Sequence, residues 1–264
     1  MNAEELNLSI RRIKSQDGEL LTNCFEPLTT FEGVSDTIET ERSLLIIRHE
    51  FKAERLFFYT KELADLAQAF EMLDKGTYYL DIVSKSDEYA KHELESSGFR
   101  CIGEMMRLAC KDISQVLQND SPEMVYFDSA IGLTAQPADA EDIYKLLWSV
   151  FDTGISHLPD IDEVKRMISD EEIVVHKENG RITALLQEKM QPKRYYINQI
   201  YNSSEKKTIH ALLLNRLAAY VHGGGKYAYS WVEKNNIASQ KFHNKFGFEH
   251  DGLWNIVYQL DKNE

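Results

Sequence analysis

The sequence has little cysteine and no long hydrophobic run, and these absences exclude several classes of protein. Its three cysteines lack C-x-x-C spacing, which argues against a disulfide framework and a structural zinc site. No stretch approaches the roughly 20 consecutive apolar residues of a membrane-spanning helix. The charged N-terminus lacks the apolar core of a secretory signal. We therefore expect a soluble, cytoplasmic protein in which Cys24, Cys101 and Cys110 are buried thiols.

Positive charge is also scarce, because 30 lysines and arginines stand against 43 aspartates and glutamates, a net charge of -13. This balance repels phosphate backbones, so we do not expect nucleic-acid binding, and a small cationic substrate fits better. The eight histidines are dispersed, and none pairs with a histidine or cysteine at ligand spacing. No metal site is therefore expected.

The length of 264 residues favours two modest domains. Prolines and glycines mark few linkers, but the polar segment 111–122 ends in turn-forming residues. A boundary at this segment predicts one domain over residues 1–120 and a second over residues 126–264.

Hydrophobic periodicity in the second domain predicts a mixed α/β order, with hairpin-connected strands first and helix-connected strands after. The expected strands span 130–136, 172–177, 181–190, 194–201, 226–232 and 253–260. The expected helices span 139–151, 161–169, 206–222 and 236–246. Glu178-Asn179-Gly180 predicts a tight turn between two of the strands.

A weak internal repeat suggests that the two domains are related. Residues 78–99 align without gaps with residues 227–248, with five identities that include a closing Gly-Phe pair in each copy. Any strand-helix-strand unit of this length would look partly similar. Each copy, however, follows a helix of similar length, over 61–73 and 210–222, and precedes a strand.

The segment NNIASQKFHNKFGF carries the most specific pattern. Asn236 suits a helix N-cap, Ser239 and His243 share one face, and Gly247-Phe248 stops the helix and opens a strand. A capped amphipathic helix with a partly exposed histidine accounts for the same residues. With the element order before it, the pattern resembles the GNAT superfamily of acyl-CoA-dependent N-acetyltransferases over residues 130–264.

This resemblance implies a GNAT-like α/β fold with a mixed sheet, in a tandem arrangement whose N-terminal half is degenerate. It implies acetyl-CoA as the cosubstrate, bound where the central strand and the strand after the long helix splay apart. The pantetheine arm would follow the backbone of Gln199, Ile200 and Tyr201. The diphosphate would lie at the start of the long helix, where the backbone amides and the helix dipole favour anions. The implied cofactor-binding residues beyond that strand are Lys206, Lys207, Thr208, Ile209, His210, Asn236 and Ser239.

The diphosphate turn departs from the family's pattern [QR]-x-x-G-x-[GA]. Glu205, Thr208 and His210 stand at its three diagnostic positions. Lys206 and Lys207 supply charge, whereas His210 places a ring where the family has a small residue. A plain helix start with a solvated lysine pair is the alternative interpretation.

The resemblance also places catalytic roles. His243 stands where the family has the acid that protonates the departing thiolate, and its ordinary pKa suits the task. Glu188 is the candidate base, with an exposed edge-strand carboxylate as the alternative. His157, in the loop that in the family closes over the acceptor, is a candidate for specificity.

The sequence therefore predicts an N-acetyltransferase that acts on a small amine or amino-acid-like acceptor. The rival interpretation is a non-catalytic tandem GNAT-like module for ligand or protein binding, with impaired CoA binding. The N-terminal half also lacks glycine at the equivalent turn, so we expect no cofactor there. We expect this half to support the other half, to dimerise or to form a wall of the substrate cleft, and a homodimer is one expected assembly.

Overall fold

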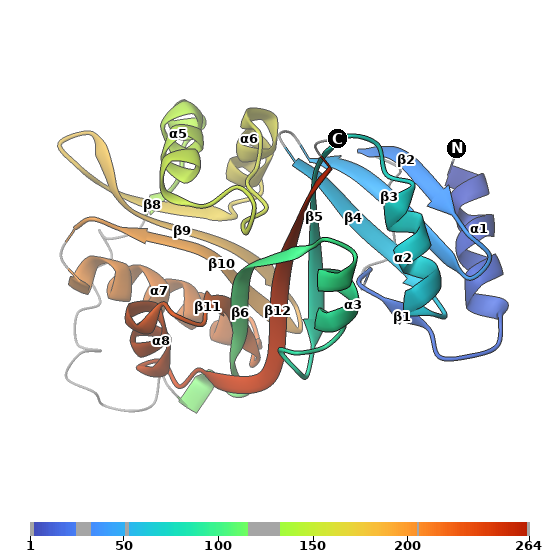
Figure 1. Ribbon diagram of the computed structural model, residues 1–264. Coiled ribbons are helices and arrows are strands. Elements are labelled where there is room, and N and C mark those ends of the chain that lie inside the picture. Colours follow the sequence, from blue (N-terminus) through green and yellow to red (C-terminus); the bar gives the residue numbers. More distant parts are fainter. Residues whose placement is uncertain (1–2, 25–32, 51–52, 116–132, 205, 263–264) are drawn as a thin grey trace. The chain divides into compact units, whose positions relative to one another are not determined.

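The computed structural model describes residues 3–24, 33–50, 53–115, 133–204 and 206–262 (Figure 1). The chain forms two compact units. Unit 1 comprises Met1–Glu104, Asp152–His157 and Leu253–Glu264, and unit 2 comprises Met105–Phe151 and Leu158–Gly252.

The first part of the chain forms helix α1, a strand meander and two further helices. Its elements are α1 (Ala3–Ser15), β1 (Leu21–Thr22), β2 (Val34–Glu39), β3 (Ser43–Glu50), β4 (Ala53–Thr60), α2 (Leu63–Glu71), β5 (Gly76–Ser84), α3 (Lys91–Ser96) and β6 (Arg100–Cys110). Strands β2, β3 and β4 are antiparallel neighbours, and β5 pairs with β4 in parallel.

The second part repeats the order of meander, helix, strand, helix and strand. Its elements are β7 (Leu133–Thr134), the 3-10 turn η2 (Pro137–Asp139), α5 (Ala140–Val150), α6 (Ile161–Ser169), β8 (Ile173–Glu178), β9 (Arg181–Gln191), β10 (Arg194–Asn202), α7 (Lys206–His222), β11 (Ala228–Glu233), α8 (Ile237–Asn244) and β12 (Glu249–Lys262). Strands β8, β9 and β10 are antiparallel neighbours, and β11 pairs with β10 in parallel. The mixed α/β class expected from the sequence is confirmed.

Local sequence signals place the elements of the second part. The bounds of α6 and α7 match the expected helices, and β8 to β11 differ from the expected strands by one or two residues. Asn179 and Gly180 both have positive φ, as the tight turn between β8 and β9 requires. The expected strand at 130–136 is shorter, because β7 covers only Leu133–Thr134, and residues 130–132 lie outside the described part of the chain.

The internal repeat corresponds to real structural equivalence. In both copies a glycine in the left-handed region, Gly98 at φ 89° and Gly247 at φ 70°, ends the short helix before the last strand. Each of the two parallel pairs also holds together over only three residue positions. The two halves of the sequence therefore repeat one architecture.

The last strand of each half completes the sheet of the other unit. The section of β6 from Met105 to Cys110 pairs with β11, and the section of β12 from Trp254 to Lys262 pairs with β5 (Figure 1). The compact units therefore differ from the expected division into 1–120 and 126–264. Polar stretches of the sequence indicate linkers. The boundaries of the two units depend instead on which distant strand forms the backbone hydrogen bonds at each sheet edge.

Each unit has its own apolar core. In unit 1, α2 and α3 cover one side of the sheet and α1 packs with buried residues of β3 and β4. In unit 2, α5 and α6 pack with β8 and β9, whereas α7 and α8 pack together on a cluster that includes β10 and β11 (Figure 1). Helix α7 is buried at six of its nine residues from Ile209 to Leu217, so it is a core helix.

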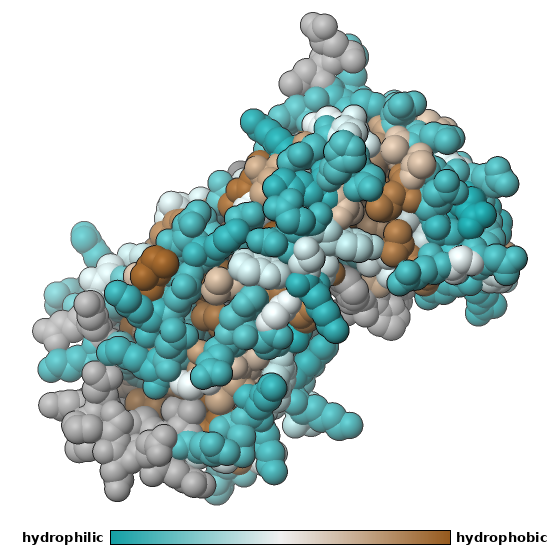
Figure 2. Space-filling model, turned by 60° about the horizontal axis from the view of Figure 1, so that its bottom comes forward, coloured by the Kyte–Doolittle hydropathy of each residue, from teal (hydrophilic) through white to brown (hydrophobic). Residues whose placement is uncertain are grey.

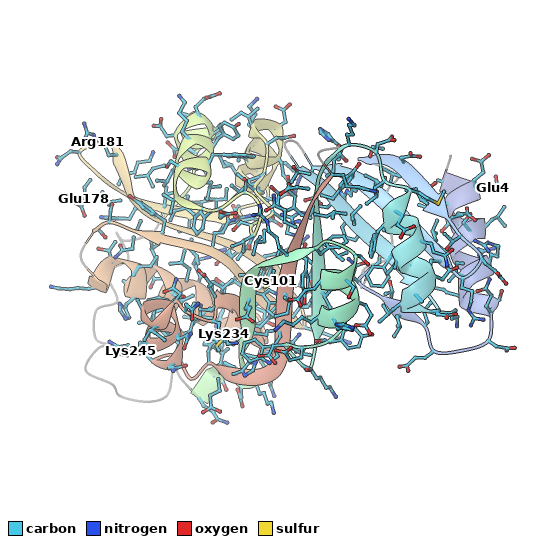
Figure 3. The ribbon with its side chains drawn as sticks, in the orientation of Figure 1. Glu4, Cys101, Glu178, Arg181, Lys234 and Lys245 are labelled. Atoms are coloured by element: carbon cyan, nitrogen blue, oxygen red, sulfur yellow. The ribbon has the colours of Figure 1, made fainter. Side chains whose placement is uncertain are left out.

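The surface agrees with the acidic, polar composition. The face in Figure 2 is mostly hydrophilic, with scattered apolar residues. Figure 3 shows Glu178 and Arg181 at the tip of the β8–β9 hairpin. Among the described residues, no helix is long and apolar enough to cross a membrane. The expectation of buried thiols holds for Cys110 only, because Cys24 is half-buried and Cys101 is exposed.

Because β12 pairs with β5, a core substitution in β12 should destabilise unit 1. Ile256 is 1% exposed and lies opposite Ile82 of β5. Ile256→Ala should destabilise unit 1 by about 2–5 kcal/mol, because the lost methyl groups leave a cavity. Hydrogen exchange should show faster opening of β5 amides and unchanged protection in β8 and β9.

Glu249→Ala, at the exposed start of the same strand, is the matched control and should change neither unit. If Ile256→Ala loosened β8 and β9 instead, the assignment of β12 to unit 1 would be wrong.

Candidate functional site

A split in the sheet of unit 2 is the first part of the site. Tyr195 to Ile197 of β10 pair with Ala228 to Ser230 of β11, and the parallel pairing stops there although both strands continue. At this point β10 also carries a bulge, since its register with β9 shifts between Ile197 and Gln199. Beyond the split, the facing strand edges leave backbone groups for an extended ligand to bind.

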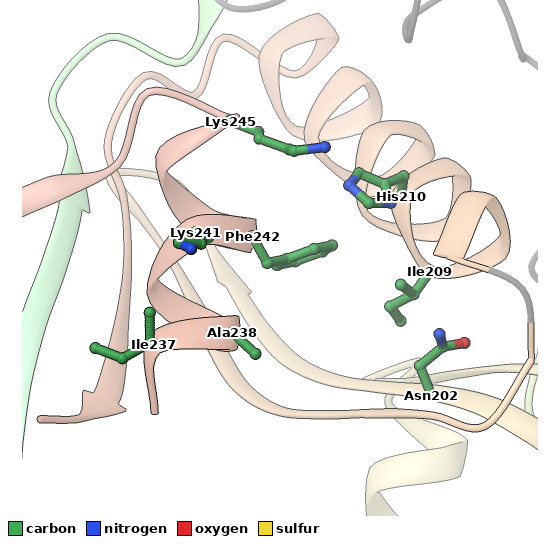
Figure 4. Close-up of a pocket in the computed structure, with 8 residues that line it drawn as sticks. All are labelled: Asn202, Ile209, His210, Ile237, Ala238, Lys241, Phe242 and Lys245. Atoms are coloured by element: carbon green, nitrogen blue, oxygen red, sulfur yellow. The ribbon is translucent and has the colours of Figure 1, made fainter. Parts of the chain in front are cut away.

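A groove opens beside this split, between α7, α8 and the end of β10 (Figure 4). Its volume is about 520 Å³, and its lining residues are Asn202, Ile209, His210, Ile237, Ala238, Lys241, Phe242 and Lys245. The walls are mainly apolar. Lys241 of α8 and Lys245, the C-cap of that helix, stand about one turn apart at the rim of the groove, and the Lys245 side chain extends toward His210. The groove thus combines an apolar interior with positive charge, in a chain whose net charge is strongly negative.

The first turn of α7 supplies one end of the groove. Thr208 and Ile209 are buried, Lys207 is exposed, and His210 lies in the wall with its ring 4.9 Å from that of Phe242. Glu205 and the side chain of Lys206 lie outside the described part of the chain. His210 therefore narrows the groove where the family pattern has a small residue, which is the main difference from that pattern.

The three expected pantetheine-binding residues lie on β10 just after the bulge. Gln199 is 5% exposed and pairs with Gln187, Ile200 packs toward α7 and α8, and Tyr201 packs toward α5 and α6. Their side chains are therefore committed to the core. Only their backbone is placed at the split, as the resemblance implies.

Helix α8 carries the signature residues in defined roles. The carboxamide oxygen of Asn236 accepts a hydrogen bond from the Ser239 amide at 3.0 Å, so Asn236 is the N-cap. The Ser239 carbonyl accepts a hydrogen bond from His243 Nδ1 at 2.9 Å. Asn236 and Ser239 thus fix the start of α8 and the orientation of the His243 ring.

His243 is buried and neutral in character. Its side chain is 1% exposed, and burial lowers its pKa, although the bond to the Ser239 carbonyl opposes this shift. Because Nδ1 donates its proton to that carbonyl, Nε2 carries the lone pair, and it has no hydrogen-bond partner among the described residues. Phe242, in the groove wall, contacts the rings of both His243 and His210. Nε2 of His243, which lies behind Phe242 of the groove wall, can therefore accept a proton. It can donate a proton only after it has accepted one.

Glu188 is not an exposed edge carboxylate. It is 2% exposed on the internal strand β9, where Arg216 Nε donates to Oε1 at 2.5 Å and the Tyr195 hydroxyl donates to Oε2. Burial raises its pKa, and the charge of Arg216 opposes that shift. Both oxygens are engaged, so the geometry suits an internal anchor for α7 better than a general base.

Unit 1 has the same split between β4 and β5, but the chain itself fills it. At the end of the paired residues, Asn23 donates to the carbonyls of Leu56 at 2.9 Å and Asp81 at 3.1 Å, and it accepts from the Phe58 amide. Strand β1, just before Asn23, pairs with the free edge of β4. The backbone groups that the unit 2 split leaves available are satisfied internally here.

The groove beside α2 and α3 of unit 1 also differs in charge. At the repeat positions of Lys241, Phe242 and Lys245, helix α3 has His92, Glu93 and Ser96, all of which line that groove. A carboxylate there disfavours an anionic ligand.

Sequence reasoning missed most of the groove. Ile237, Ala238, Lys241, Phe242, Lys245 and Asn202 were not expected as binding residues. The spacing of Lys241 and Lys245 and the 53% exposure of the apolar Ile237 mark one face of α8, but only the nearness of α7 makes that face a wall. His157, expected over the acceptor, belongs to unit 1. Within the described ranges, no cluster of three or more ligating side chains is arranged for a metal.

Solved structures resemble the chain over most of its length. A GCN5-related N-acetyltransferase from Sphaerobacter thermophilus is 13% identical, with a TM-score of 0.59 over 85% of this chain and 82% of that one. A tandem GNAT protein from the clavulanic acid biosynthesis pathway is 12% identical, with a TM-score of 0.59 over 100% and 97%. An acetyltransferase of the GNAT family from Colwellia psychrerythraea is 11% identical, with a TM-score of 0.54 over 99% and 98%.

No protein-family model and no curated protein matches the sequence. At these identities the structural likeness establishes the fold. The chain has the GNAT fold, as the sequence resemblance predicted, and its full-length match to a tandem protein agrees with the repeat.

The buried pair of Glu188 and Arg216 predicts a pH-dependent cost of breaking it. Arg216→Ala leaves a buried carboxylate without its cation, so it should destabilise the protein by about 3–5 kcal/mol at pH 8. The pKa of Glu188 is already raised and rises further without Arg216, so the carboxyl takes up a proton as the pH falls. The cost should therefore be smaller at pH 5, as denaturant unfolding can measure.

The double variant Glu188→Gln with Arg216→Met removes both charges and should be more stable at pH 8 than Arg216→Ala alone. An equal cost at the two pH values would contradict the buried-pair assignment.

Proposed function

We propose that the protein is an N-acetyltransferase that transfers the acetyl group of acetyl-CoA to a small amine or an amino-acid-like acceptor. The observation that carries the proposal is the groove with apolar walls and a lysine rim at the open end of the β10–β11 split. The GNAT fold supports the reaction class. The donor and acceptor are inferred from the chemistry of the site.

Acetyl-CoA matches the groove in two ways. The phosphates of the cosubstrate are anionic and complement the lysines at the rim, and its long thioester arm suits the apolar walls. In the proposal, the backbone of Gln199, Ile200 and Tyr201 pairs with the amide groups of that arm. The phosphates lie at the start of α7, where Thr208 and the positive end of the helix dipole favour negative charge. Lys241 and Lys245 add charge at the rim.

His243 is the proposed proton-transfer residue. As the amine nitrogen attacks the thioester carbon, the nitrogen must lose a proton, and as the carbon–sulfur bond breaks, the thiolate must gain one. A neutral imidazole with its lone pair on Nε2 can take the first proton and return it to the sulfur. The sequence resemblance implied that His243 is already protonated when the reaction begins and acts as an acid. Burial lowers its pKa and favours the neutral ring, so in the proposal His243 first acts as a base. Glu188, the base expected from the sequence, serves in this proposal to position Tyr195 and Arg216.

One observation favours the rival function, a non-catalytic GNAT-like module that binds a ligand or a protein. His210 occupies groove volume at a position where the family pattern has glycine or alanine. If His210 excludes the diphosphate, the same groove would accept a smaller or less charged ligand. A direct binding measurement separates the two functions.

Isothermal titration should show that one acetyl-CoA binds per chain, because Asn23 and β1 close the split of unit 1. Lys241→Ala and Lys245→Ala should each weaken binding about two- to fivefold, as expected for partly screened charges, and the loss should shrink at high salt. Lys189→Ala, at an exposed position of β9, is the matched control and should not change affinity.

The absence of binding at millimolar acetyl-CoA would reject the enzyme and favour the rival module. Two binding sites per chain would contradict the closure of unit 1.

If acetyl-CoA binds, His243→Phe should lower kcat about 10²- to 10⁴-fold with little change in the affinity for acetyl-CoA. Because the pKa of His243 is lowered from its ordinary value, activity should persist as the pH falls below about 6.5. Activity should then be lost through the lowered pKa, where the imidazole becomes protonated. Steady-state thiol release against a panel of amines gives both profiles.

Asn236→Ala is the control for disturbance of α8, since it removes only the cap, at a cost of about 1 kcal/mol in stability. Equal kcat values in His243→Phe and the wild type would refute the proton-transfer role.

A further inference from the structure

Unit 1 contains a network of charged side chains for which the proposed reaction has no use. Arg55 of β4 is 1% exposed, yet its guanidinium donates to Glu50 at 3.0 Å and to Asp81 at 2.9 Å. Its second terminal nitrogen donates to the carbonyls of Gly154 at 3.2 Å and Ser156 at 3.4 Å. Buried arginine with all three nitrogens engaged is a built feature, because an unpaired buried guanidinium is very unfavourable.

The carbonyl partners of Arg55 belong to a short segment that enters unit 1 from the middle of the chain. Residues Asp152–His157 connect α5 to α6, and they are part of unit 1. The Asp152 carboxylate accepts from the amides of Gly154 at 2.7 Å and Ile155 at 3.1 Å, which folds the segment into a compact turn.

The segment fits closely against unit 1 at two glycines. A Cβ atom on Gly154 would lie 2.7 Å from the Tyr79 ring and 3.0 Å from Ile102. A Cβ on Gly103 would lie 3.0 Å from the Ile155 side chain. Both approaches therefore need glycine, on the segment and on the surface that receives it.

His157 closes the network with a second cation. Its Nδ1 lies 2.9 Å from Glu50 and its Nε2 lies 3.5 Å from Asp81. Among the described residues, the groups that also face the network include Arg48 of β3, Asn255 of β12, which donates to Asp81, and the Tyr79 ring beside Arg55. With His157 protonated, its charge and that of Arg55 balance those of Glu50 and Asp81.

The network also occupies the point where the unit 1 split begins. Asp81 follows directly after Leu80, the last residue of β5 that pairs with β4. By strand register and repeat alignment, Arg55 and Asp81 correspond to Tyr195 and Ser230 of unit 2. Charged groups thus replace neutral ones at two corresponding positions of the parallel strand pair.

We propose that unit 1 is a clamp for the chain's own Asp152–His157 segment, with Glu50, Arg55 and Asp81 as the receptor and His157 as the closing cation. The clamp restrains the connection between α5 and α6. Unit 1, whose own split is closed, would thus serve to position this connection. The proposal does not depend on the proposed reaction, and none of its tests requires catalysis.

Protonation of His157 sets the strength of the clamp. The two carboxylates raise the His157 pKa to about 9, against partial desolvation of the ring and the charge of Arg55, and the pKa of Asp81 is lowered to about 2. A histidine whose pKa is raised in the clamped state stabilises that state fully below the ordinary value. The stabilisation is lost as the pH rises toward 9, by at most tenfold per pH unit for one proton. Above that range the network carries a net negative charge.

Hydrogen exchange on the full chain tests the clamp. At pH 7, Arg55→Lys and Asp81→Asn should accelerate exchange of the amides at Gly154, Ile155 and Ser156 at least tenfold. Amides of the β8–β9 pairing should keep their protection. Arg100→Lys, which alters an exposed ion pair with Asp261 in the same unit, is the matched control and should change nothing in the segment.

Because Arg55 is buried, its variant can also loosen unit 1 as a whole. His157→Gln, at a half-exposed side chain, avoids this problem and should open the segment while the β3–β4 amides stay protected. Unchanged exchange of the segment in His157→Gln and Asp81→Asn would overturn the proposal.

A second measurement follows the imidazole itself. NMR titration should place the His157 pKa near 9 in the wild type and markedly lower in Asp81→Asn. After correction for intrinsic chemistry, segment exchange should rise between pH 7 and pH 10 in the wild type and stay constant in His157→Gln. A wild-type pKa at the ordinary value of about 6.5 would refute the closing role of His157.

Discussion

The short parallel pairing at the centre of each sheet is the constraint on which the rest of the structure depends. Two strands held together over three residue positions and then parted expose backbone donors and acceptors on facing edges. These groups must be satisfied by water, by a ligand or by other parts of the chain. The two halves of the protein meet this requirement in opposite ways.

In unit 1 the chain satisfies its own split. Asn23 bridges the two parted strands with three hydrogen bonds, and Arg55 and Asp81 fill the point of the split with charge. In unit 2 the equivalent positions, Tyr195 and Ser230, are neutral, and a groove with apolar walls lies between α7, α8 and the end of β10. Under the proposals above, the half whose split is closed holds a segment of the chain, and the half whose split is open binds acetyl-CoA.

Electrostatics in unit 2 follow the same division between support and site. Glu188 and Arg216 form a buried pair between β9 and α7, so this charge serves the packing of the long helix. The positive charges that line the groove are those of two exposed residues, Lys241 and Lys245. His243 combines features of both groups. Its ring is buried with the core, yet Nε2 has no hydrogen-bond partner among the described residues.

Local sequence patterns determined much of the fold. The apolar residues that recur every four positions in α7, the Asn-Gly turn and the Gly-Phe pairs are encoded within short windows. The repeat and most elements of the second part could therefore be predicted, although the bounds of β7 and β12 were not. The signature from Asn236 to Phe248 is likewise local, and with the element order it was enough to predict the GNAT fold at identities near 12%.

Only the tertiary structure decided which strand completes which sheet, which split is open and which side chains form the groove. The exchange of β6 and β12, the placement of Asn23 between two strands and the capture of Asp152–His157 by Arg55 join residues that are far apart in sequence. Such contacts are selected by the need to satisfy buried backbone and charged groups over the whole fold. No local pattern in the chain specifies which distant partner will do so.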